Sequence, residues 1–260
     1  MKIIFQPSGS FLFCCCMEAI ERIKTVRDIV IDDYRTADIF KKWGINYCCG
    51  GNLPLDEACE VKNIDRVALE KDIQNATRNV RMSNSLAYDA WPLEFLIDYI
   101  VHVHHAYLRS TLPSLKQFVD SFINGHIKKY PYLASVRETF EYLVTELEEH
   151  TNYEEESLFP YVKQISNTFK RREVYGNLFV RTMRKPMSDV VNAAHNRISH
   201  LLVQLREQTN HYTFATEACA NHQVMYRKLK ELDDDLVQHK HLENNILFPK
   251  AMEMEKSLLQ

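Results

Sequence analysis

Two segments of this 260-residue chain share one pattern. Residues 150–160 read HTNYEEESLFP, and residues 239–249 read HKHLENNILFP. In each segment a His is followed four residues later by a Glu, both segments end in Leu-Phe-Pro, and the copies start 239 − 150 = 89 residues apart. Side chains at positions i and i+4 of a helix lie on one face, about 6 Å apart along the axis, where an imidazole and a carboxylate can bind one metal ion. The repeat therefore predicts two helices that face each other across a metal site.

Two further histidines extend the repeat. His105 and His195 are each followed by a Leu seven residues later, and they lie 195 − 105 = 90 residues apart. The repeating unit is thus a helical hairpin, with one His on its first helix and His-x-x-x-Glu on its second. Together the two hairpins predict six metal ligands: His105, His150, Glu154, His195, His239 and Glu243.

Four imidazoles and two carboxylates suit a pair of metal ions. Mixed nitrogen and oxygen ligands favour iron or manganese over zinc, which prefers thiolates in closed sites. We expect two non-haem iron ions, each bound by two histidines, with Glu154, Glu243 and an oxo group as bridges. Because neutral imidazoles leave more positive charge on the metals than carboxylates do, this ligand set favours reversible redox chemistry, or binding of O2 or NO, over hydroxylation.

The remaining histidines and the neighbouring glutamates are weaker candidates. His102 lies three residues before His105, and the alternatives are a fifth metal ligand and, as we expect, a residue that supports a ligand through a hydrogen bond. His104 and His241 point away from the ligand-bearing faces of their helices. Surface or helix-end positions are expected for His126, His200, His211 and His222. Solvated positions are expected for Glu149, Glu155 and Glu156.

The hydrophobic pattern predicts an all-α protein. Four long amphipathic segments, near residues 92–124, 131–169, 188–208 and 214–255, predict a four-helix bundle. Pro113, Pro160 and Pro249 are expected to end or kink these helices. Before the bundle, Thr25 and Asn63 are each expected to cap a short helix, and Gly44 to end another.

We divide the chain into four parts. Residues 1–16 are expected to be a disordered extension of a protein that effectively begins near Met17. The alternative is a lipid-modified or membrane-touching tail that carries the cysteines at positions 14–16. Residues 17–76 are expected to form a small N-terminal helical domain, residues 77–90 a linker, and residues 91–256 the four-helix bundle.

The composition indicates which partners are not expected to bind and in which cellular compartment the protein is expected. The formal net charge of −3 gives no general attraction to nucleic acid or to an anionic membrane. No stretch approaches the roughly 20 apolar residues of a membrane span. The 7 cysteines are odd in number and partly adjacent, which disfavours a disulfide framework. A reducing, cytoplasmic location is therefore expected.

Cys48 and Cys49, which are followed by Gly50 and Gly51, form a second candidate site. Adjacent thiols on a loop after a helix end can take part in redox or transfer chemistry, or can deliver iron. The alternative is a turn that contains two small residues by chance. The single cysteines Cys59 and Cys219 are expected in the core.

These motifs carry a resemblance to a known family. The order Asn46-Tyr47-Cys48-Cys49-Gly50-Gly51, followed by a bundle that ends His239-Lys-His-Leu-Glu243-Asn-Asn-Ile-Leu-Phe-Pro249, resembles the iron–sulfur cluster repair di-iron proteins over residues 18–255. The resemblance implies a double-Cys domain followed by a hemerythrin-like bundle with a non-haem di-iron centre. It assigns the four histidines named above as terminal ligands and the two glutamates as bridges. Ala194 departs from the pattern, because relatives can carry an acidic residue there.

The resemblance also implies a function. Such proteins restore iron–sulfur clusters damaged by nitric oxide or peroxide by supplying iron, and they are cytoplasmic and often dimeric. We therefore expect a homodimer that serves damaged or apo iron–sulfur proteins, reacts with NO, O2 or peroxide, and uses Cys48 and Cys49 to assist iron release. The alternatives are a hemerythrin-like O2- or NO-binding or sensing protein, and an enzyme that reduces nitric oxide at the di-iron centre.

Overall fold

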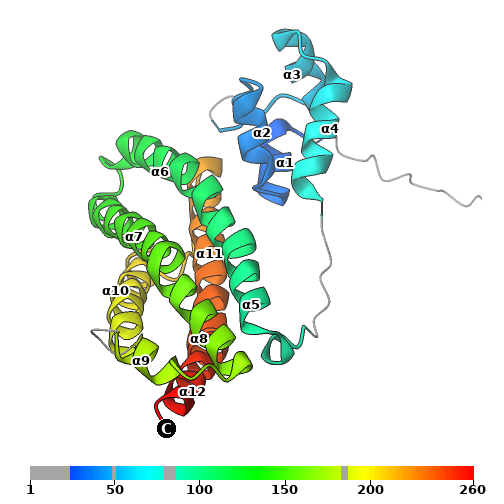
Figure 1. The fold of residues 1–260 in the computed structure, drawn as a ribbon. Coiled ribbons are helices and arrows are strands. Elements are labelled where there is room, and N and C mark those ends of the chain that lie inside the picture. Colours follow the sequence, from blue (N-terminus) through cyan, green and yellow to red (C-terminus); the bar gives the residue numbers. More distant parts are fainter. Residues whose placement is uncertain (1–23, 49–50, 79–85, 183–186) are drawn as a thin grey trace, which may run out of the picture.

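The computed structural model describes residues 24–48, 51–78, 86–182 and 187–260, and every regular element in these ranges is a helix (Figure 1). The predicted all-α fold class is confirmed. The expected extension at residues 1–16 lies outside the described residues, as do Cys49 and the middle of the expected linker. None of the described helices is long and apolar enough to cross a membrane.

The described part of the N-terminal domain contains four short helices. They are α1 (Val26–Asp32), α2 (Thr36–Lys42), α3 (Leu55–Lys62) and α4 (Arg66–Thr77). Thr25 caps α1 as predicted, because its hydroxyl accepts the Asp28 amide while the Asp28 carboxylate accepts the Thr25 amide. Gly44 follows α2 with φ at +69°, which glycine adopts without strain. The prediction for Asn63 is wrong: it ends α3 in the left-handed conformation, and Asp65 caps α4.

Four helical rods form the bundle, and three of them contain a π-helical turn. The first rod is α5 (Leu93–Tyr99), η2 (Ile100–His105) and α6 (Ala106–His126); the second is α7 (Leu133–Tyr153), η3 (Glu154–Leu158) and α8 (Phe159–Arg171). The third is α10 (Met187–Gln208), and the fourth is α11 (Ala220–Leu242), η4 (Glu243–Leu247) and α12 (Phe248–Leu258). The short helices η1 (Tyr88–Ala90) and α9 (Gly176–Arg181) precede the first and third rods.

The prolines do not end the rods, so that part of the prediction is wrong. Pro113 lies inside α6, and Pro160 and Pro249 lie in the first turns of α8 and α12, directly after η3 and η4. In a regular α-helix the proline ring would clash with the carbonyl four residues earlier. A wider π-helical turn just before the proline relieves this clash. The repeated Leu-Phe-Pro therefore marks a widened turn in a continuing helix.

Two apolar cores fill the bundle, one on each side of a polar layer. The larger core is built mainly by α6, α7, α10 and α11, and the smaller by α5, α8 and α12. Along the second rod, for example, Leu147 belongs to the larger core and Leu158 to the smaller, with His150 and Glu154 between them. The six predicted ligands therefore lie in a layer that apolar side chains shield from water on both sides.

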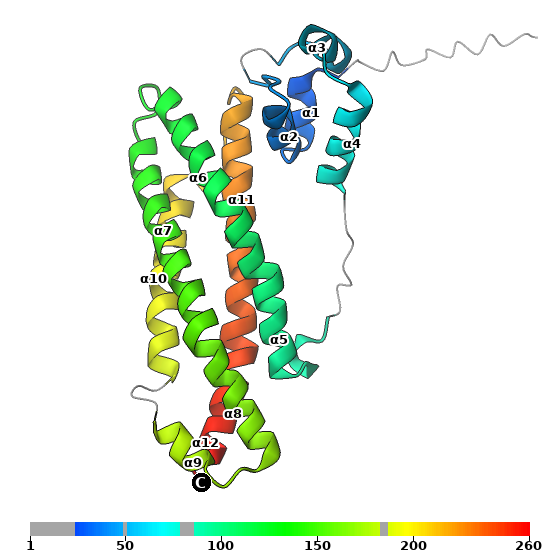
Figure 2. The ribbon, with the colours of Figure 1, turned by 45° about the horizontal axis from the view of Figure 1, so that its top comes forward.

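The N-terminal domain packs against α11, and Figure 2 shows α1 and α2 beside the upper half of that helix. Val26 and Val30 of α1 belong to the same apolar core as α11. The Tyr34 hydroxyl donates to Glu231 at 2.7 Å, and Lys228 pairs with Asp38. The contact is thus both apolar and polar, and it brings the loop after α2 to the N-terminal end of α11.

Candidate metal centre

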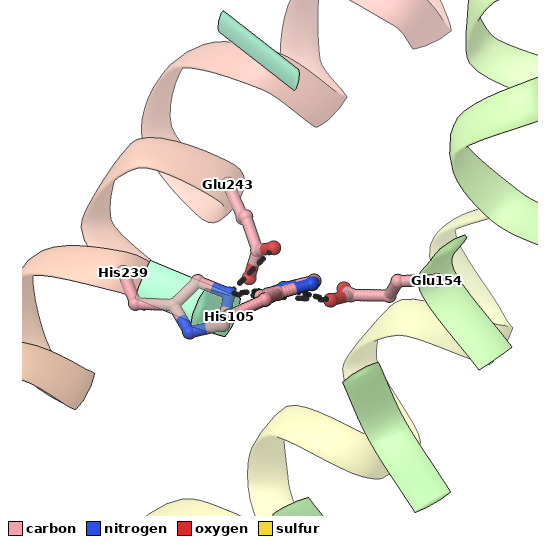
Figure 3. Close-up of side chains that lie close together, drawn as sticks. All are labelled: His105, Glu154, His239 and Glu243. Atoms are coloured by element: carbon pink, nitrogen blue, oxygen red, sulfur yellow. Dashed lines mark hydrogen bonds and ion pairs between the residues drawn. The ribbon is translucent and has the colours of Figure 1, made fainter. Parts of the chain in front are cut away.

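The structure brings all six predicted ligands together in the polar layer. The first rod supplies His105, the second His150 and Glu154, the third His195, and the fourth His239 and Glu243. Each of the six side chains is buried, with at most 7% of its surface exposed. Figure 3 shows four of them, from three rods, pointing toward one another.

The ligand atoms form two overlapping groups. One group contains His105 and His239, and the other contains His150 and His195. Glu154 and Glu243 belong to both groups, and within each group one ligand atom per residue lies within 4.8 Å of the others. Each group therefore offers two imidazoles, and both groups share the same two carboxylates.

The distances between these atoms are those of groups gathered around a common centre. His105 Nε2 and His150 Nε2 lie 3.4 and 3.3 Å from the same oxygen of Glu154. On the other side, His239 Nε2 lies 2.9 Å and His195 Nε2 lies 3.3 Å from the carboxylate of Glu243. The carboxylate oxygens of Glu154 are buried and have no hydrogen-bond partner. Since an unpaired buried carboxylate is costly, a cation at this position fits the residues.

Burial sets the protonation of the imidazoles. It lowers the pKa of His105 to about 4 and that of His150 to about 3, so both rings are neutral near neutral pH. A neutral imidazole is the form that binds a metal.

The pKa values of the two buried carboxyl groups shift in opposite directions. Burial, together with the charge of Glu243, raises the pKa of Glu154 well above its usual range. Burial alone would also raise the pKa of Glu243, but His239 and His195 beside it hold that pKa well below its usual range. Glu243 in turn raises the pKa of His239 against the opposing effect of burial. Without metal, the site therefore keeps a proton on Glu154 and pairs Glu243 with His239.

The π-helical turns place three of the ligands. His105 is the last residue of η2, while Glu154 and Glu243 are the first residues of η3 and η4. A π-helical turn bonds i to i+5, so residues three apart no longer share a face as they do in an α-helix. This explains why the prediction for His102 is wrong: it lies within η2 with His105, and its side chain is exposed.

Two residues, each directly after one of the shared glutamates, support histidines on neighbouring rods. His105 Nδ1 donates to Glu155 at 2.7 Å, and His195 Nδ1 donates to Asn244 at 2.6 Å. These bonds orient each ring so that Nε2 faces the centre. Arg109 also pairs with Glu155. The expectation that Glu155 is solvated is therefore wrong.

The supporting residues obey the same repeat as the ligands. Glu155 and Asn244 each follow a candidate bridging Glu, and they lie 244 − 155 = 89 residues apart, the spacing of the His-x-x-x-Glu copies. Each accepts from the His on the first helix of one hairpin, at equivalent places in the repeat. The sequence thus contained a signal for Asn244, which our reading of the ligand spacing missed.

His104 is buried but belongs to neither group of ligands. Its Nδ1 lies 2.9 Å from Asp235, and its ring stacks on that of His239 with centroids 5.5 Å apart. The prediction that it does not share the metal-facing side agrees with this position. Its contact with His239 makes it a packing neighbour of the site.

The described cysteines Cys48, Cys59 and Cys219 do not lie among the metal ligands. Cys48 is half-buried after α2 and contacts Cys219, the residue before α11, whereas Cys59 is buried in the core as predicted. Cys219 precedes His239 by 239 − 219 = 20 residues, which is about 30 Å along a helix. Cys48 is therefore not beside the metal ligands. The core position expected for Cys219 is wrong, since it is only half-buried.

Two of the other histidines lie at helix ends, as expected, but both make contacts that the sequence did not predict. His222 is buried among aromatic rings, including those of Phe122 and Tyr130, and is not at the surface. His126 does end its helix as predicted, but its ring contacts Cys219.

Two family models match parts of the chain. Residues 22–77 match the ScdA_N family, described as a domain of unknown function (DUF542). Residues 96–251 match the hemerythrin HHE cation binding domain, which covers all six candidate ligands.

Several curated proteins are similar over most of their length. The iron-sulfur cluster repair protein ScdA of Staphylococcus haemolyticus is 29% identical over 86% of this chain and 96% of its own. The iron-sulfur cluster repair protein YtfE of Escherichia coli O157:H7 is 29% identical, and that of Citrobacter koseri is 30% identical, each over 89% of this chain and 97% of its own. The chain therefore belongs to the family of iron–sulfur cluster repair proteins that join an ScdA_N domain to a hemerythrin HHE cation binding domain.

Proposed function

We propose that this protein repairs damaged iron–sulfur clusters by donating iron from a di-iron centre in its bundle. The observation that carries the proposal is the pair of buried ligand groups that share Glu154 and Glu243. Two shared carboxylates between two pairs of imidazoles suit two iron ions held close together. The names of the relatives support repair as the purpose of such a site.

The protein's own residues prepare the site for a cation. Burial keeps His105 and His150 neutral, and Glu155 and Asn244 orient His105 and His195. The apolar cores exclude water above and below. Two bound irons would supply one-electron redox chemistry and coordination positions for NO, O2 or peroxide.

A pocket beside one ligand supports the idea that iron is meant to leave. It has a volume of about 260 Å³, and its walls include His150, Ala194, Glu146 and Glu149. Ala194 has only a methyl group where relatives can carry an acid, and the two glutamates supply carboxylates in the same pocket. We propose that iron leaves past His150 through this pocket, guided by Glu146 and Glu149.

The partners follow from this role. We propose that damaged or apo iron–sulfur proteins in the cytoplasm receive the iron, and that the chain works as a homodimer without nucleic acid or membrane. A role of Cys48 and Cys49 in release stays a prediction, and the distance along α11 limits Cys48 to acting away from the ligands.

Anaerobic transfer of labelled iron from the purified protein to an apo iron–sulfur protein tests the proposal. We expect the acceptor to gain a cluster, and we expect E146Q/E149Q to slow the transfer without changing the iron bound at the start. The matched control is Glu138→Gln, an exposed glutamate earlier on the same helix, α7. Cys48→Ala/Cys49→Ala should slow the transfer of iron to the acceptor, and transfer as fast as that of the wild type would contradict a role of the two cysteines.

Other results would favour the alternatives. Iron that stays on the protein while O2 or NO binds reversibly would favour a binding or sensing protein. Repeated turnover of NO to N2O with an electron donor would favour a nitric oxide reductase.

A further inference from the structure

A second group of reactive side chains lies where the N-terminal domain meets the bundle. Cys48 follows α2, His126 is the last residue of α6, and Cys219 is the N-cap residue of α11. The Cys48 thiol hydrogen-bonds to Cys219, and Cys219 Sγ lies 3.5 Å from His126 Nε2. Three segments that are far apart in sequence thus bring two sulfurs and an imidazole together.

The hydrogen bonds of His126 determine where it can accept a proton. Its Nδ1 lies 2.8 Å from the carbonyl oxygen of Phe122, which can only accept, so Nδ1 carries a hydrogen. In the neutral ring Nε2 then presents a lone pair to Cys219. Cys219 can transfer its proton to Nε2, which leaves a thiolate beside an imidazolium, as in other cysteine nucleophiles that are activated by histidine.

The surroundings of Cys219 stabilise its thiolate. The Cys48 thiol donates to it, and the amide of His222 and the ring of His126 act in the same direction. The sulfur also lies at the N-terminus of a helix of 23 residues, where the helix dipole favours negative charge. Against the opposing effect of burial, these contacts lower the pKa of Cys219 to about 5. Near neutral pH, Cys219 is a thiolate and Cys48 is the thiol that donates to it.

A pocket of about 390 Å³ lies directly beside two members of this group. Cys48 and His126 form part of its wall, together with Lys41 and Phe122. Metal binding is the less suitable use, because the described residues that could together hold one metal ion all lie in the bundle layer. A small oxidant such as hydrogen peroxide, in contrast, fits the pocket and reacts with thiolates.

We propose that Cys48 and Cys219 form a redox-active pair, which hydrogen peroxide oxidises to a disulfide between the N-terminal domain and the bundle. The Cys219 thiolate attacks one peroxide oxygen, the O–O bond breaks, and the departing hydroxide takes the proton held by His126. Cys219 is left as a sulfenic acid. The Cys48 sulfur then attacks the Cys219 sulfur, and the sulfenic hydroxyl leaves as water with the Cys48 proton. In sum, two thiols lose two electrons and one peroxide becomes two waters.

This pairing gives Cys48 a partner other than its neighbour in sequence. A disulfide between adjacent cysteines is strained. Cys219, in contrast, already lies in hydrogen-bonding contact with Cys48 and is held there by the packing of α1 on α11. Oxidation would therefore fasten two domains in the arrangement that they already have.

Mass spectrometry of the oxidised full-length, metal-loaded protein tests the pairing. After treatment with a stoichiometric amount of peroxide and digestion without reductant, we expect a peptide pair joined through Cys48 and Cys219. Cys219→Ser should abolish it, and Cys48→Ser should leave a sulfenic acid at Cys219 that a dicarbonyl probe captures. Cys59→Ser, which changes a cysteine buried in the N-terminal domain, is the matched control and should leave the cross-link unchanged.

The pH dependence of Cys219 alkylation tests the activation separately. We expect a midpoint near 5 in the wild type, and a midpoint higher by at least about one pH unit in Cys48→Ala, which has no donor, and in His126→Gln. A wild-type midpoint near the ordinary value of about 8.5 would overturn the proposal, and so would a disulfide formed mainly between Cys48 and Cys49. Cys48→Ala and Cys219→Ala, checked for folding by circular dichroism, provide a second set of variants.

Discussion

The metal centre and the thiol pair lie toward opposite ends of α11, and they differ in how water reaches them. Two apolar cores enclose the metal centre, so each of its six ligands is buried. Cys48 and Cys219 are half-buried beside a pocket. Burial at the first site keeps imidazoles neutral and disfavours isolated charge, whereas a helix N-terminus and a thiol donor at the second stabilise an anion. One helix thus carries a site for cations and a site for a reactive thiolate.

The first prediction removes the charge that both metal positions share. Glu154→Gln should reduce bound iron from about two ions per chain to less than half of that, because Glu154 belongs to both ligand groups. Iron analysis after anaerobic loading measures this. The matched control is Glu156→Gln, an exposed glutamate two residues later in η3, which should retain its iron. Equal iron content in the two variants would contradict the shared role of Glu154.

The second prediction concerns the residues that orient the histidines. Asn244→Ala and Glu155→Ala should each weaken iron binding about 10- to 100-fold, because His195 and His105 lose the acceptors at Nδ1. Competition with a chelator of known affinity measures the change. Asn245→Ala, whose side chain contacts exposed His241, is the control. No change in affinity would mean that packing alone orients the rings.

The third prediction is the release of protons when metal binds. The raised pKa values of Glu154 and His239 mean that both groups hold protons to higher pH than usual in the metal-free protein. A cation displaces these protons, so binding should weaken as the pH falls. Calorimetry in buffers of different ionisation enthalpy counts the released protons, and Glu154→Gln should release about one fewer. Proton uptake on binding would contradict the assignment.

The fourth prediction tests whether the domain contact and the metal centre are independent, and it has the smallest expected effect. Tyr34→Phe removes the hydroxyl that donates to Glu231 across the domain contact, and it should lower the free energy of unfolding by about 0.5–1.5 kcal/mol. Urea denaturation measures this. The iron content should not change, since the contact lies near the thiol end of α11. A loss of iron would show that the two regions are coupled more tightly than their burial suggests.

The sequence predicted the bundle and the convergence of the six candidate ligands because helical spacing and an 89-residue repeat constrain them strongly. It did not predict which side His102 faces, because η2, unlike η3 and η4, has no proline directly after it that marks a π-helical turn. The prediction for Glu155 was wrong for a related reason: from η3 it contacts His105 of η2, although regular helical geometry places it off the face that carries Glu154.

The partner of Cys48 lay beyond sequence reasoning for another reason. Cys219 comes next to it only through the docking of the N-terminal domain on α11, a contact between segments with no shared pattern. The burial of His222 also depends on tertiary packing, in which aromatic residues from α6 and α11 meet around its ring.

X-ray absorption spectroscopy of the iron-loaded protein tests the central claim most directly, which is that two irons share Glu154 and Glu243. We expect two irons per chain with nitrogen ligands from imidazole, separated by about 3.5–4 Å. In Glu154→Gln the iron–iron scattering should disappear. A single iron per chain, or two irons with no iron–iron scattering in the wild type, would contradict the account.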